Sequence, residues 1–128
     1  MGMWFLSEKS VVARLESILR KIEDIEFIIQ RHGGVVNALE DREGQPAILM
    51  LIEAIAEQFH KIETKNKALQ VLKTFDPHIL KGIQATRTVI AHDYDGIDLG
   101  LIELGLRDLP ALKETLSQHL AEEPEQES

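Results

Sequence analysis

Two long stretches of the chain repeat apolar residues at steps of three and four, the spacing of an amphipathic helix. The first runs from Ser10 to Gln30, and its apolar stripe consists of Val11, Leu15, Ile18, Ile22, Ile25 and Ile29. The second begins near Pro46, and its stripe consists of Ile48, Ile52, Ile55, Phe59 and Ile62. Gly33 and Gly34 can form a left-handed C-cap after the first helix, and Pro46 suits the first turn of the second. The pattern therefore predicts two long helices.

The polar stretch from Asn37 to Gly44, between these helices, is expected to be a loop. A short apolar segment follows the second helix, from about Thr64 to Lys73. Asp76 and Pro77 form an N-cap and first-residue pair, which predicts a third long helix that ends near Ala91.

Further helix starts are predicted at Asp98 and at Asp108-Leu109-Pro110, and the last apolar stripe consists of Leu112, Leu116 and Leu120. No segment alternates strictly between apolar and polar residues, as a half-buried strand would. The predicted fold class is all-α, an antiparallel bundle of four to five helices in one domain over residues 1–121. Residues 122–128 are expected to be a polar, disordered tail.

Composition narrows the function classes. The 128 residues are 44% apolar and contain no cysteine, which excludes disulfides, thiolate metal sites and thiol nucleophiles. The formal net charge of −8 makes coating of duplex DNA unfavourable, although a few arginines in a cleft can still hold one phosphate. The apolar cluster from Met3 to Leu6 is too short for a signal peptide or a membrane span. We expect a cytoplasmic protein without membrane association.

The pair Glu57-x-x-His60 has the spacing that carboxylate-bridged di-metal bundles use. Such a site needs two copies of the pair and two more carboxylates, and the sequence contains one copy. We interpret Glu57 and His60 as a solvated helix face. The sequence also lacks a Walker glycine loop and a serine-hydrolase elbow, so no metal and no cofactor is expected.

Residues 86–95, TRTVIAHDYD, hold the most informative polar residues. On a helix that begins at Pro77, Arg87 falls within the apolar stripe. A guanidinium in that position needs a carboxylate on a neighbouring helix, a subunit interface or an anion in a cleft. His92 lies about 140° away on a straight helix. The two side chains can serve one patch if the helix ends near His92, as the turn-forming residues Asp93 to Gly96 favour.

An arginine that holds a phosphate and a histidine that moves protons suffice for metal-independent RNA cleavage. In that reaction the ribose 2′-hydroxyl is the nucleophile, so the protein does not have to supply one.

The string R-x-x-x-x-H-x-Y, present as Arg87, His92 and Tyr94, resembles the signature of the HepT-like toxins in the HEPN superfamily. The apolar pattern of Leu51 to Ile62, the later Asp-Tyr-Asp-Gly-Ile-Asp and the segment that begins at Asp108 are similar too, so the resemblance covers about residues 8 to 121. It implies a helical bundle that forms a homodimer through the motif helix. It also implies a metal-independent endoribonuclease whose catalytic Arg87 and His92 line a cleft at the dimer interface, with Thr88 in support.

The same resemblance implies a partner, a minimal nucleotidyltransferase antitoxin. It inhibits the toxin by binding it, by transferring AMP from ATP to the motif tyrosine, here Tyr94, or by both. One departure is Thr88, because the family typically carries asparagine or another strongly polar residue there, and a second is the absence of a tryptophan ahead of the motif. An alternative is therefore a noncatalytic HEPN module that docks a nucleotidyltransferase and presents its substrate. A third interpretation is a structural helical dimer in which Arg87 only pairs with a carboxylate.

Overall fold

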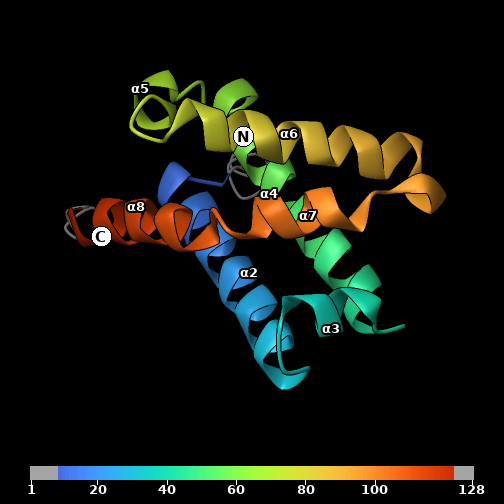
Figure 1. The fold of residues 1–128 in the computed structure, drawn as a ribbon. Coiled ribbons are helices and arrows are strands. Elements are labelled where there is room, and N and C mark those ends of the chain that lie inside the picture. Colours follow the sequence, from blue (N-terminus) through green and yellow to red (C-terminus); the bar gives the residue numbers. More distant parts are fainter. Residues whose placement is uncertain (1–8, 123–128) are drawn as a thin grey trace.

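The computed structural model describes residues 9–122, which form seven α-helices and one short 3-10 helix (Figure 1). In chain order these are α2 (Val11–Arg31), α3 (Val35–Glu40), α4 (Gly44–Thr64), α5 (Leu69–Leu72), α6 (Pro77–His92), η1 (Tyr94–Gly96), α7 (Leu99–Leu106) and α8 (Leu109–Glu122). No strand occurs among these residues, which confirms the all-α prediction. The expected tail lies outside the described residues except for Glu122, the last residue of α8, and so does the apolar cluster from Met3 to Leu6.

Helices α2 and α4 form an antiparallel pair, and α6, α7 and α8 lie across them (Figure 1). The α2 helix begins at Ser10, whose hydroxyl accepts a hydrogen bond from the N–H of Ala13 at 3.0 Å. It ends at Arg31 and is followed by Gly33 and Gly34, both with positive φ, as expected from the sequence. Most of the two predicted stripes is buried, including these core residues: Leu15, Ile18, Ile22, Ile25, Ile48, Ile52, Ile55, Phe59 and Ile62.

The expected loop from Asn37 to Gly44 is wrong in part, because Val35–Glu40 forms helix α3. This single turn and a half buries Ala38 and Leu39 against α2 and α4, and that burial outweighs the polar residues around them. Gly44 packs so closely that a Cβ there would lie 2.5 Å from the carbonyl oxygen of Ala38. Packing between helices, which local composition does not reveal, therefore decides the structure of this segment.

Asp41 sits in the turn between α3 and α4. Its carboxylate accepts hydrogen bonds from the N–H groups of Gly44 and Glu43, each at 2.8 Å, and lies 3.2 Å from Nε2 of His32. The two backbone N–H groups, with a smaller contribution from His32, hold the pKa of Asp41 below its usual value. Asp41 therefore fixes the start of α4 close to the end of α2.

The α4 helix is the element on which α6 is positioned. Phe59 of α4 meets Phe75, just before α6, in an edge-to-face contact with ring centroids 5.3 Å apart. Further along, Nε2 of Gln84 donates a hydrogen bond to the carbonyl oxygen of Ala56 at 3.0 Å. These two contacts fix where the motif helix crosses α4. Among residues 9–122, no helix combines the length and apolar character needed to cross a membrane.

Candidate functional site

The motif helix α6 has well-defined ends. At its start, Asp76 accepts a hydrogen bond from the N–H of His78 at 2.8 Å, and Pro77 is the first helical residue. At its end, the N–H of Asp93 donates to the carbonyl oxygen of Val89 at 2.8 Å, and the chain then leaves the helical conformation. The last helical residue is His92, which confirms the prediction that the helix ends near this histidine.

Arg87 faces α4, where its Nη2 lies 2.5 Å from Oε1 of Glu57. The Arg87 side chain is 31% exposed and that of Glu57 is 37% exposed, so the pair lies at the rim between the two helices. The other carboxylate oxygen of Glu57 lies 3.4 Å from Nζ of Lys61, one helical turn later on α4. Of the three partners that the sequence left open for Arg87, the structure shows a carboxylate on a neighbouring helix.

This pairing corrects the interpretation of Glu57 as part of a solvated face. Glu57 is half-buried and engaged with Arg87, whereas His60 is exposed. The i,i+4 spacing of Glu57 and Lys61 signals a charged ridge on α4. It does not identify the partner of that ridge, because the partner depends on where α6 crosses α4.

His92 is exposed at the end of α6. Within residues 9–122 no hydrogen bond or ion pair joins it to Arg87, in keeping with their divergence on a regular helix. Thr88 is exposed, and its hydroxyl donates to the carbonyl oxygen of Gln84 at 3.1 Å within α6. The Thr88 oxygen is therefore left with acceptor capacity. A single protomer brings Arg87 and Glu57 together and keeps His92 apart from them.

Tyr94 is the first residue of η1 and is 45% exposed. The turn around it is closed by a hydrogen bond from the N–H of Gly96 to the carbonyl oxygen of Asp93 at 3.1 Å. The next residue, Ile97, packs against the core, and Asp98 then caps α7 by accepting from the N–H of Gly100 at 2.9 Å. Tyr94 is thus presented on an anchored turn two residues after His92.

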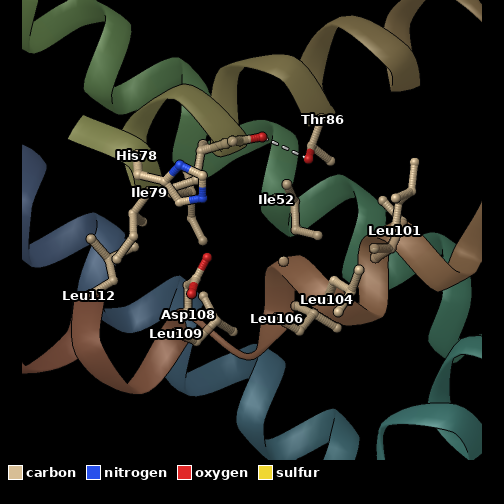
Figure 2. A pocket seen from close by; sticks show the side chains of 15 residues that line it. Ile52, His78, Ile79, Thr86, Leu101, Leu104, Leu106, Asp108, Leu109 and Leu112 are labelled. Carbon is tan, nitrogen blue, oxygen red and sulfur yellow. Dashed lines mark hydrogen bonds between the residues drawn. The ribbon is translucent and has the colours of Figure 1, made fainter. Parts of the chain in front are cut away.

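A groove of about 370 Å³ runs between α6 and α7 on another side of the motif helix (Figure 2). Its floor is apolar and includes Ile52 and Ile79, and Figure 2 shows His78 and Asp108 at one end of it. Leu101 and Leu104 lie near the other end and are 63% and 53% exposed. These leucines and Val89 of α6, which is 43% exposed, leave an apolar surface beside the motif helix.

Comparison with curated proteins and with solved structures finds no match. The sequence model of one family, described as ribonuclease HepT-like, matches residues 18–119. The match contains α4, α6 and α7 in full, and with them Glu57, Arg87, His92 and Tyr94. This chain belongs to the family of HepT-like ribonucleases.

Proposed function

We propose that this protein is a metal-independent endoribonuclease and the toxin of a toxin–antitoxin pair, with Arg87 and His92 as its catalytic residues. The observation that carries the proposal is the arrangement of α6. One helix holds a half-buried, oriented arginine and ends at an exposed histidine. Membership of a ribonuclease family gives this arrangement its chemical meaning.

The proposed reaction uses the ribose 2′-hydroxyl as nucleophile. It attacks the adjacent phosphorus, the bond to the 5′-oxygen breaks, and the products carry a 2′,3′-cyclic phosphate and a 5′-hydroxyl. The Arg87 guanidinium donates hydrogen bonds to the non-bridging phosphate oxygens, on which negative charge grows in the transition state. His92 accepts the 2′-hydroxyl proton or supplies a proton to the leaving oxygen. Thr88 supports this site as a hydrogen-bond acceptor.

We propose that the working site is completed by a second copy of the chain that packs on the motif helix. Arg87 and His92 diverge within one protomer, so a cleft that uses both is built most simply from two copies of α6. The exposed Val89, Leu101 and Leu104 support this arrangement, because they place apolar surface beside α6 for a partner to cover.

RNA cleavage in the presence of EDTA tests the nuclease proposal. The purified dimer is expected to cut a labelled total RNA sample with EDTA present and to leave 2′,3′-cyclic phosphate ends. The double variant Arg87→Ala/His92→Ala is expected to cut no faster than buffer. Light scattering of the same samples checks the dimer. Cleavage that EDTA abolishes, or that the double variant retains, would contradict the proposal.

We further propose that a minimal nucleotidyltransferase antitoxin controls the protein through Tyr94. The phenol oxygen would attack the α-phosphorus of ATP, lose its proton and displace pyrophosphate, leaving AMP on the tyrosine. The exposure of Tyr94 on the η1 turn supports access by a second protein. The added phosphate would lie two residues from His92, where its negative charge repels RNA.

Intact-mass measurement after co-expression with a minimal nucleotidyltransferase is expected to show added AMP on the wild-type protein and none on Tyr94→Phe. The modified wild-type protein should no longer cleave RNA, whereas Tyr94→Phe should cleave it with or without the partner. AMP on the Tyr94→Phe variant would show that another residue is the acceptor.

A noncatalytic module that docks the nucleotidyltransferase is the second candidate. The specific observation in its favour is the exposed acidic tip formed by Asp93, Asp95 and Asp98 around Tyr94, which repels RNA but not a protein partner. A dimer that accepts AMP on Tyr94 and never cleaves RNA would select this candidate.

A further inference from the structure

The contact between Glu57 of α4 and Arg87 of α6 ties the motif arginine to a second helix that carries no part of the R-x-x-x-x-H-x-Y string. We propose that Glu57 is a positioning residue of the nuclease site, which holds the Arg87 guanidinium in the orientation that receives the scissile phosphate. This inference rests on the proposed function.

The backbone beneath this contact is fixed. Gln84 lies one turn before Arg87 on α6, and its hydrogen bond to the carbonyl oxygen of Ala56 pins α4 at the residue that precedes Glu57. The bond is partly buried, so water competes with it less than at the surface. The carboxylate of Glu57 is therefore presented to Arg87 from a backbone that the same two helices hold in place.

The contact orients Arg87 and leaves most of its N–H donors free for other hydrogen bonds. The guanidinium has five N–H donors, and Glu57 accepts from Nη2. The side chain remains 31% exposed, so part of it is accessible to a phosphate. Lys61 shares the Glu57 carboxylate, and together Arg87, Glu57 and Lys61 carry one net positive charge. An anion is therefore still attracted to this cluster.

The physical need for such a residue is geometric. An arginine side chain has many rotamers, and a free one must lose that freedom each time it binds a phosphate. Catalytic groups work only within about 0.5 Å of the productive position, and a displacement of about 1 Å can lower a rate by about a hundredfold. A carboxylate that holds one edge of the guanidinium in advance means that the arginine does not have to lose this rotamer freedom when the phosphate binds.

Steady-state cleavage of one RNA by the wild-type dimer, Glu57→Gln and Glu57→Asp tests the inference. In Glu57→Gln we expect kcat to fall by about tenfold or more, while KM stays the same or falls because a negative charge beside the phosphate has been removed. Glu57→Asp keeps the charge and should retain more of kcat. A salt bridge of only structural value would lower the melting temperature and leave kcat per folded molecule unchanged.

Glu53→Gln is the matched control. Glu53 lies one turn before Glu57 on α4, is also half-buried, and has no ion pair among residues 9–122. The same change of charge there should leave kcat unaltered. Wild-type cleavage with an equal or higher kcat in Glu57→Gln would overturn the inference alone. No cleavage by the wild-type dimer would overturn the proposed function and the inference together.

Discussion

Replacement of His92 by alanine is expected to lower the rate of RNA cleavage by about 10²- to 10⁴-fold, the usual contribution of a general acid or base. The effect should be chemical and not structural. His92 is exposed at the last turn of α6, and its side chain has no hydrogen bond or ion pair among the described residues, so its loss leaves no partner unsatisfied. The change in the free energy of unfolding should stay within about 0.5 kcal/mol.

Single-turnover cleavage measured beside thermal unfolding separates these two quantities. Arg87→Ala serves as the comparison, because it removes the proposed phosphate contact and also leaves Glu57 without its partner on α6. It should therefore lose both activity and some stability. A His92→Ala protein that cleaves RNA within a factor of about three of the wild type would exclude His92 from proton transfer, since positioned acids and bases contribute far more than that.

The long helices can be predicted from the sequence because the residues of their apolar stripes form most of the core. The stripes that begin at Val11 and Ile48 are mostly buried, and Asp76 and Asp98 cap α6 and α7 as their residue types suggest. The α3 helix was not predictable in the same way. It has only six residues, and it owes its structure to the burial of Leu39 against the flanking helices α2 and α4.

The sequence also predicts part of the candidate site, but not the contact between its helices. The position of Arg87 in an apolar stripe required some partner, and the glycine and aspartates after His92 indicated the end of the helix. Neither pattern identifies Glu57 as the partner, because Glu57 and Arg87 are 30 residues apart and their contact depends on how α4 and α6 cross. Local patterns fix which side chains need partners, and the packing of the bundle decides which partners they meet.

Arg14 is a second arginine that lies on an apolar helix face and whose partners the sequence pattern does not identify. It lies between Val11 and Ile18 on the buried face of α2 and is only 5% exposed. Its Nε donates to Oδ1 of Asn66 at 2.8 Å and its Nη1 to Oε1 of Gln58 at 3.1 Å. No carboxylate among residues 9–122 pairs with it, so two amide side chains hold this buried guanidinium. Arg14 thereby ties the start of α2 to the end of α4.

Arg14→Ala is expected to lower the free energy of unfolding by about 3 kcal/mol, because it leaves a cavity and removes the donor from two partly buried amide oxygens. For a domain of this size that corresponds to a fall in melting temperature of about 10 °C. Arg20→Ala is the control, since Arg20 is exposed on the same helix and its loss should cost less than about 0.5 kcal/mol. Thermal unfolding followed by circular dichroism measures both.

The cleavage rate per folded molecule should be nearly unchanged in Arg14→Ala, because Arg14 contacts Gln58 and not the Glu57 and Arg87 pair. Arg14→Ala would then lose stability without activity, and His92→Ala would lose activity without stability. A large fall in the cleavage rate of fully folded Arg14→Ala would show instead that a change at the contact between α2 and α4 alters the site between α4 and α6. In that case the position of Glu57 would depend on how α2 and α4 pack together. The orientation of Arg87 would then depend on that packing as well as on its contact with Glu57.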